Sequence, residues 1–202
     1  MSNKKDINHL INRAIKEGKC FLNDEKKLED FNKACIHISS LLHDSFTLYI
    51  NKRYSTATFL AITAIEEVAK LEISLFRNKE EILDVKRSKD ILYSHSAKHK
   101  IAIQDVIKIG TRLTNVLGQE RINQLVDFAK KGELLKLRES SLYFESNNNH
   151  LVIPSEVIDK NIGKEIVLLA LEVWSDRLVG ISNETYELDS KLTKLFEIIK
   201  NY

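Results

Sequence analysis

A single proline in 202 residues is the feature that most limits what this chain can fold into. Proline ends helices and removes a backbone donor from sheets, so a chain that almost lacks it can form long uninterrupted helices. The proline, Pro154, follows the polar stretch 145–150 and marks the one hard break in the pattern. The sequence therefore predicts long helices up to this break and after it.

Apolar and small residues recur at helical spacing along most of the chain. The clearest run lies between Ser55 and Arg77, and its repeating residues are Ala57, Ala61, Ala64, Val68, Leu71 and Leu75. Small side chains there allow a neighbouring helix to approach closely. By the same criteria, we expect further helices at 5–16, 24–52, 80–87, 94–116, 119–130, 133–144, 155–181 and from 183 to the C-terminus.

Strand-like residues are few and occur on either side of the polar turn, at 142–144 and 151–153. We therefore predict an all-α fold, an antiparallel helical bundle with a short irregular or hairpin-like turn near 145–153. The length fits one domain over 1–202.

Charge and cysteine content exclude several classes of protein. Charged residues make up 30% of the chain, but the net charge is only +2, which does not indicate a basic nucleic-acid-binding tail. Cys20 and Cys35 form no CxxC pair, and no apolar signal region follows the N-terminal residues. The apolar run 166–171 is too short to span a bilayer. We expect a cytoplasmic protein with two free thiols and no membrane association.

The first polar group lies in the alanine-rich helix. Glu66 and Lys70 are four residues apart, so they face each other and can form an ion pair on the helix surface. Glu67, one step around the helix, is expected nearer the bundle interior, where its carboxylate can orient a basic group.

The second group is His95, Lys98 and His99. The two histidines are one helical turn apart, but a zinc site needs further ligands, and no HExxH motif or cysteine cluster supplies them. We expect no metal and no cofactor. His95 and Lys98 are three apart on one helical face, where they can stabilise a phosphate or simply solvate the helix start.

The third group is Arg138 and Tyr143. An arginine near a helix end can bind a phosphate with two parallel hydrogen bonds. Tyr143 can donate a hydrogen bond or stack on a base. The structural alternative is that Arg138 pairs with a carboxylate such as Glu67 while Tyr143 packs against its neighbours.

Together these groups resemble the AbiV family of bacterial abortive-infection proteins, a branch of the HEPN superfamily. The segment Tyr54–Lys70 is similar to the alanine-rich helix of that family, which ends in Glu-Glu-x-x-Lys. His95 and Lys98 match its His-x-x-Lys, and Leu137–Tyr143 matches its Leu-Arg-x-x-x-Leu-Tyr. The resemblance covers residues 25–182, which leaves an N-terminal and a C-terminal helix on either side.

The resemblance implies a helical protein that defends against phage and commonly dimerises. Many HEPN proteins are metal-independent ribonucleases with Arg-x(4–6)-His, but here Arg138 is followed by Tyr143 where a histidine is expected. A tyrosine, with a pKa near 10, is a poor base at neutral pH. A further departure is that Lys52-Arg53 stands where such proteins often have a glycine before the alanine-rich helix.

These observations support a dimeric ribonuclease as the first hypothesis. In this hypothesis Arg138 binds the phosphate with help from Lys98, and His95 acts as acid or base from another helix. Tyr143 positions the RNA. Glu67 orients Arg138 or His95, and Glu66 and Lys70 belong to the same orienting group.

The second hypothesis is a non-catalytic effector that blocks the translation machinery by binding it, with a phage-encoded protein as the trigger. It is motivated by the missing histidine and the near-neutral charge. The third is a helical scaffold without a defence role. A homodimer is expected from the resemblance.

Overall fold

The structure, a computed structural model, describes residues 2–77, 85–103, 111–147 and 150–202. Within these residues the chain is helical apart from turns and one two-stranded sheet, which confirms the all-α prediction. The elements are α1 (Ser2–Lys16), η1 (Asp24–Lys26), α2 (Lys27–Ile50), α3 (Tyr54–Phe76), η3 (Arg87–Lys89), η4 (Ile91–Tyr93), α4 (His95–Ile103), α6 (Thr111–Leu117), α7 (Gln119–Lys130), α8 (Glu133–Ser140), β1 (Glu145–Asn147), β2 (His150–Val152), α9 (Pro154–Val157), α10 (Lys160–Leu178) and α11 (Asn183–Asn201).

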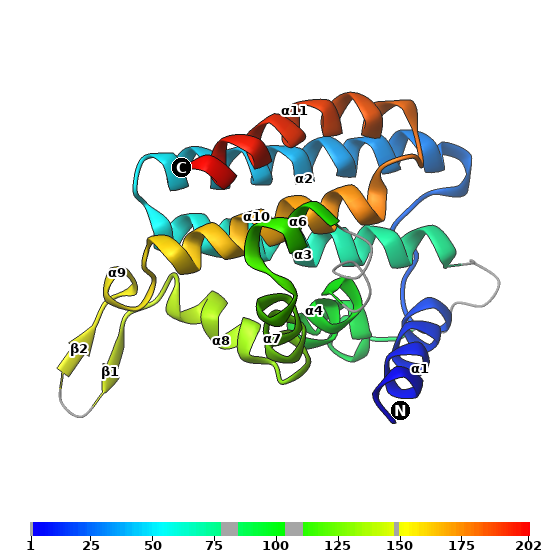
Figure 1. The fold of residues 1–202 in the computed structure, drawn as a ribbon. Helices are drawn as coiled ribbons and strands as arrows, with labels where there is room; N and C mark the ends of the chain where they lie inside the picture. The colour runs from blue at the N-terminus through cyan, green and yellow to red at the C-terminus, as the bar shows by residue number, and fades with distance from the viewer. Residues whose placement is uncertain (1, 78–84, 104–110, 148–149) are drawn as a thin grey trace.

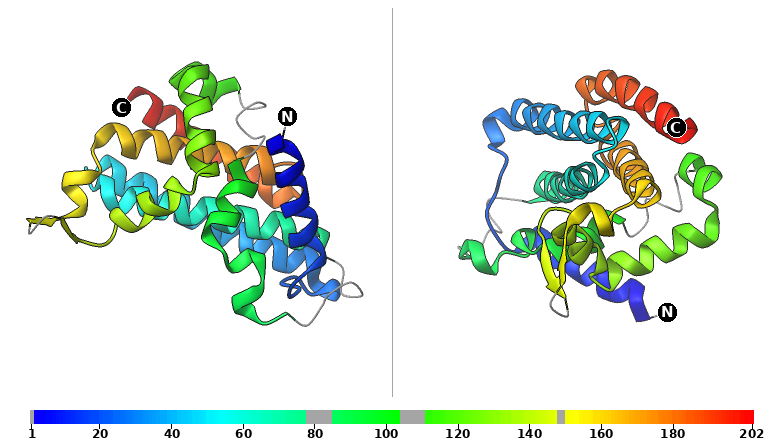
Figure 2. Two further views of the ribbon diagram at one scale, coloured as in Figure 1. Left: turned by 90° about the horizontal axis from the view of Figure 1, so that it is seen from below. Right: turned by 90° about the vertical axis from the view of Figure 1, so that its left-hand side faces the viewer.

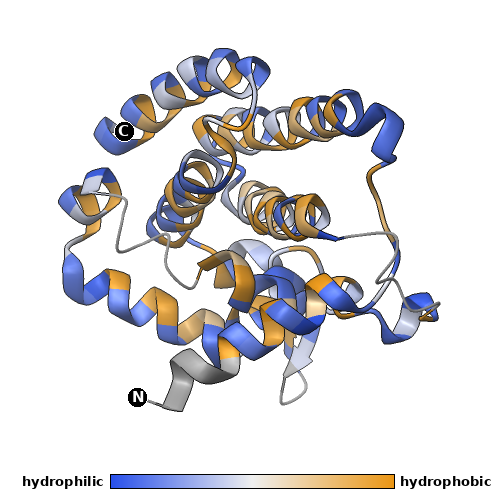
Figure 3. Cartoon of the chain, turned by 90° about the vertical axis from the view of Figure 1, so that its right-hand side faces the viewer, coloured by the Kyte–Doolittle hydropathy of each residue, from blue (hydrophilic) through white to orange (hydrophobic). Residues whose placement is uncertain are grey.

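The long helices α2, α3, α10 and α11 form the main bundle (Figure 1). α3 packs against α2 and α10, and α11 covers the other side of these two. Ala57, Ala61 and Ala64 of α3 are fully buried, as expected from their spacing, and Trp174 of α10 lies in the core. The apolar faces turn inward and the hydrophilic faces outward (Figure 3). None of the described helices combines the length and apolarity of a membrane span.

A second group of helices, α1, α4, α7 and α8, lies across one side of this bundle (Figure 2). α4 packs on α3, α7 and α8, and α8 also contacts α3. As a result, α3 has one face against α2 and α10 and another against α4 and α8. Polar residues on α3 can therefore meet residues from helices that are distant in sequence.

The predicted hairpin is present. β1 and β2 pair antiparallel, with Ser146 opposite Leu151. The expectation of a strand at 142–144 is wrong, because these residues form the turn that leaves α8. Pro154 then occupies the first turn of α9, where its missing N–H costs nothing.

The single helix expected over 155–181 is divided in two. α9 ends at Val157, and Asp159 begins α10 by accepting a hydrogen bond from the backbone N–H of Ile162 at 2.8 Å. α7 has the predicted bounds. Within the helix expected at 94–116, the structure describes α4 and α6, and residues 104–110 between them lie outside the described residues. The helix expected at 80–87 also lies largely outside the described residues.

A buried ion pair joins the end of α3 to the residue before η4. The Arg77 guanidinium donates to Asp90 Oδ1 at 2.7 Å and to Oδ2 at 3.1 Å, and both side chains are fully buried. Arg77 also donates to three backbone carbonyls, those of Ala14, Glu17 and Lys19. This network positions the N-terminal helix and the turn that precedes α4.

Candidate functional site

The carboxylate of Glu66 is the centre of a polar cluster between α3, α4 and α8. Glu66 is only 2% exposed. One oxygen, Oε2, accepts from His95 Nδ1 at 2.6 Å and from Lys98 Nζ at 3.1 Å. The other, Oε1, accepts from His99 Nε2 at 2.8 Å and lies 3.5 Å from Arg138 Nε. We call these five residues the Glu66 cluster.

Glu66 is ionised over the whole physiological pH range. Burial, the largest influence, raises its pKa, but the hydrogen bond from His99, the Lys98 ammonium and the hydrogen bond from His95 together outweigh it and lower the pKa to about 2. A buried charge of this kind is stable only when it is paired and hydrogen-bonded, as it is here. The cluster is therefore a fixed anion surrounded by nitrogen donors.

His95 is the most accessible histidine of the cluster. It is the first residue of α4, and its side chain is 41% exposed. Because Glu66 is anionic, the proton of this hydrogen bond lies on Nδ1 of His95, so Nε2 is the unprotonated nitrogen in the neutral form of the ring. A carboxylate that fixes a histidine in this way makes the second nitrogen available as a proton acceptor.

His99 is the cluster member that the sequence analysis did not assign. Its ring is fully buried, one turn after His95, and donates Nε2–H to Glu66. Burial lowers its pKa more than the bond to Glu66 raises it, so His99 is neutral, and its Nδ1 is buried without a partner among the described residues. The spacing of one helical turn between His95 and His99 was the sequence feature that could have indicated that both rings face the same group. In the described residues the two rings share a carboxylate, and no group of three or more residues is arranged to bind a metal ion.

Arg138 enters the cluster from α8. Its guanidinium lies over the ring of Phe59 on α3, 4.7 Å from the centroid, which keeps the cation partly desolvated. Only Nε approaches Glu66, and no described residue accepts a hydrogen bond from its two terminal nitrogens. These nitrogens are the pair that binds a phosphate with two parallel bonds. Arg138 thus pairs with Glu66, where the sequence suggested Glu67.

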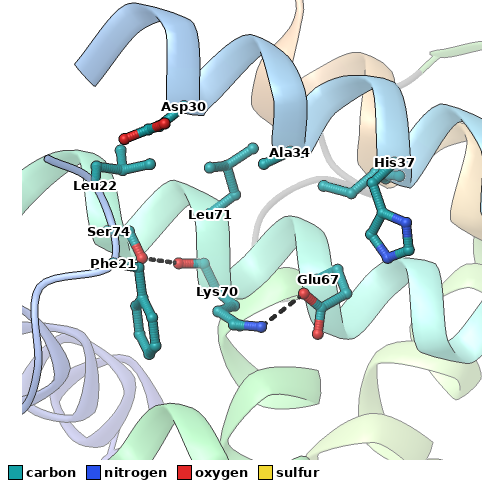
Figure 4. A pocket seen from close by; sticks show the side chains of 10 residues that line it. Phe21, Leu22, Asp30, Ala34, His37, Glu67, Lys70, Leu71 and Ser74 are labelled. Atoms are coloured by element: carbon teal, nitrogen blue, oxygen red, sulfur yellow. Dashed lines mark hydrogen bonds and ion pairs between the residues drawn. The ribbon is translucent and has the colours of Figure 1, made fainter. Parts of the chain in front are cut away.

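The expectation that Glu67 lies nearer the interior than Glu66 is wrong. Glu67 points to the other side of α3 and pairs with Lys70 at 2.8 Å, so the predicted pair of Glu66 with Lys70 does not form. Both residues line a cavity of about 360 Å³ between α2 and α3 (Figure 4). The Glu-Glu-x-x-Lys element is therefore divided between two sides of one helix.

Tyr143 lies in the turn after α8, and 59% of it is exposed. Among the described residues its side chain forms no hydrogen bond or ring contact with Glu66, His95 or Arg138. The structure thus brings together four of the residues singled out by sequence, Glu66, His95, Lys98 and Arg138, and places Tyr143 in solvent beside them along the chain.

Comparison with known proteins identifies a family for this chain. A HEPN-type family model, described as AbiV, matches residues 27–175, a range that contains every member of the Glu66 cluster. No curated protein and no solved structure gave a match.

Proposed function

Because this chain belongs to the AbiV family of HEPN proteins, we propose that it is an abortive-infection protein that limits phage growth by cutting RNA. The supporting observation is the Glu66 carboxylate, which joins His95 of α4 to Arg138 of α8. The sequence lacks a histidine at the usual distance after Arg138, and this pairing supplies one from another helix.

His95 is suited to act as the base. Its side chain is 41% exposed, Glu66 holds the proton of Nδ1, and Nε2 is left to accept a proton from a substrate. In the proposed step, Nε2 accepts the proton of an RNA 2′-hydroxyl, and the 2′-oxygen attacks the adjacent phosphorus. The bond from phosphorus to the 5′-oxygen breaks, that oxygen takes a proton from water, and the proton on His95 returns to solvent. The products are a 2′,3′-cyclic phosphate and a 5′-hydroxyl.

Arg138 is suited to bind the phosphate that is attacked. Its terminal nitrogens are available, and its position over Phe59 favours the fixed geometry that bidentate binding requires. The cluster contains the cations Lys98 and Arg138 against the single anion Glu66, so it has an excess positive charge when both histidines are neutral. Lys98 is nearly buried and bonded to Glu66, so it contributes to this charge and to orientation.

A non-catalytic effector is the second candidate, and one observation favours it. Large apolar side chains are exposed around the hairpin, namely Leu142, Tyr143, Phe144, Leu151 and Ile153. Exposed apolar groups of this kind mark protein interaction sites. The translation machinery, a phage-encoded trigger or a second copy of the chain are the partners we propose for this surface.

Expression in bacteria separates the two functions. Wild type, His95→Ala, Arg138→Ala and the control His43→Ala, an exposed histidine of α2, are induced, and growth and total RNA are followed with and without phage. We expect growth arrest with fragmented RNA for wild type and His43→Ala, and intact RNA for the other two, although all four are folded by circular dichroism. Arrest with intact RNA in wild type would overturn the ribonuclease and support the effector.

A further inference from the structure

A second cationic site lies at the end of the bundle where α3 begins. A cavity of about 450 Å³ separates residues 52–56 from residues 153–155 and Ile158. We call it the Lys52 pocket. Its lining residues lie in the turn between α2 and α3, at the start of α3, and in and beside α9, and Figure 1 shows these elements at one end of the bundle.

The charged residues that line the Lys52 pocket are both cationic. Lys52 and Arg53 are exposed, and neither forms an ion pair within the described part of the chain. None of the described residues that line the pocket is acidic. The neighbouring carboxylate of Glu156 accepts a hydrogen bond from the backbone N–H of Ile153 at 3.1 Å. The uncompensated cations attract an anion, and a phosphodiester matches them.

Lys52 also has an unusual backbone. Its φ of 61° lies in the left-handed region, where a lysine is strained and a glycine is not. Strain that persists where glycine would relieve it points to a need for the side chain. Here that side chain is a cation beside the pocket.

The Lys52 pocket and the Glu66 cluster lie along one face of α3. Ser55, Phe59 and Glu66 are four and seven residues apart, so they project from the same side of the helix. At about 1.5 Å per residue, Ser55 lies about 6 Å along the axis from Phe59, the ring that Arg138 covers. An RNA strand bound at Arg138 therefore has only a short distance to cover from Arg138 to the Lys52 pocket.

Exposed aromatic rings accompany this path. Tyr143 and Phe144 form the turn between α8, which contains Arg138, and the hairpin that leads to Pro154 at the pocket wall. Cations together with exposed rings are typical of proteins that bind single strands, since bases stack on the rings and phosphates pair with the cations.

We propose that the Lys52 pocket is a second phosphate subsite, where Lys52 and Arg53 bind the backbone of a single-stranded RNA whose cleavage site lies at Arg138 and His95. This inference rests on the proposed ribonuclease function. The subsite supplies affinity and register and takes no part in the chemical step.

Binding of a fluorescein-labelled single-stranded RNA with 2′-O-methyl riboses tests the subsite, because this probe lacks the attacking hydroxyl. Fluorescence anisotropy is measured over a range of salt for wild type, Lys52→Gly and Arg53→Ala. The control is Lys191→Ala on α11, an exposed lysine on a helix that packs against α2 and α10. Lys52→Gly removes the charge and relieves the positive φ, so loss of binding is not explained by misfolding.

We expect Lys52→Gly and Arg53→Ala each to bind about tenfold more weakly, with a salt slope lower by about 0.7 for each lost phosphate contact, and Lys191→Ala to bind as wild type. Equal binding by all four proteins, or no binding by wild type, would overturn the subsite.

Cleavage of unmodified RNA separates this result from the proposed function. If binding depends on Lys52 and Arg53 but wild type leaves RNA intact, the subsite stands and the ribonuclease fails. If wild type cuts RNA and both variants bind and cut equally well, the ribonuclease stands and the subsite fails.

Discussion

Glu66 and Glu67 are consecutive residues of α3, yet their carboxylates lie on different sides of the helix. Glu66 faces α4 and α8 and accepts hydrogen bonds from two histidines and a lysine. Glu67 faces the cavity next to α2 and pairs with Lys70 (Figure 4). The pair therefore offers a matched comparison, in which the same substitution at adjacent positions removes a charge from one site only.

We expect Glu66→Gln to lower RNA cleavage by about 10²-fold. The amide no longer fixes the proton on Nδ1 of His95, so the base loses its orientation. The rate is measured with purified protein and a labelled RNA. Glu67→Gln is the control, and its rate should remain within about twofold of wild type. Equal losses in both variants would contradict a special role for Glu66.

The same carboxylate should make stability sensitive to acid. Its pKa is lowered from 4.5 to about 2, so the stabilisation is present above pH 4.5 and is lost as pH falls towards 2. The shift corresponds to about 3 kcal/mol of unfolding free energy. Urea denaturation of wild type and Glu66→Gln between pH 2 and 7 measures it. The advantage of wild type should shrink in this window, and a constant difference would show that the charge of Glu66 is not involved.

The sequence predicted much of the fold because its signals are local. The alanine spacing of α3 and the bounds of α7 follow from hydrophobic periodicity, which depends on neighbouring residues. The break at residues 158–159 was missed because Asp159 caps α10 after a single helical turn that begins at Pro154, and no glycine or second proline marks the place.

The site was harder to predict, since its geometry depends on tertiary packing. Periodicity places Glu66 and Glu67 about 100° apart on α3, but it does not say which side meets α4 and α8. His99 was seen only as a partner of His95 for a metal, because the carboxylate that both rings share lies 33 residues from His99 in sequence.

The buried pair of Arg77 and Asp90 should be essential for stability. We expect Arg77→Met or Asp90→Asn to lower the free energy of unfolding by about 3–5 kcal/mol, because either change leaves the other charge buried without its partner. Urea denaturation measures the loss. The control is Arg13→Met, which removes an exposed pair with Glu17 and should cost less than about 1 kcal/mol. Similar costs for the buried and the exposed pair would contradict this assignment.

Gly18 lies beside the ion pair of Arg77 and Asp90, and we expect a glycine there to be required for full stability. Its φ is 106°, and a side chain there would collide with the carboxylate of Asp90 and the guanidinium of Arg77. We expect Gly18→Ala to destabilise the protein by at least about 1 kcal/mol, through both the backbone conformation and the displaced ion pair. Thermal unfolding measures the effect. Gly118→Ala is the matched control, because Gly118 also has a positive φ but has open space around it, so it reports the backbone cost alone. Equal losses at both glycines would indicate that Asp90 moves aside without cost.

Asp176 should make the protein less stable at neutral pH than at pH 4. Burial raises its pKa to about 6, and the nearby carboxylate of Glu172 adds to the rise. The native state therefore binds this proton more tightly than the unfolded state, and stability falls as pH rises from about 4 to 6. Asp176→Asn should remove this slope and stabilise the protein at pH 7 by about 1–2 kcal/mol, a figure reduced for partial solvent screening. Urea midpoints between pH 4 and 7 measure it, with the exposed Asp127→Asn as control. If the slope survives in Asp176→Asn, the charge of Asp176 is not its source.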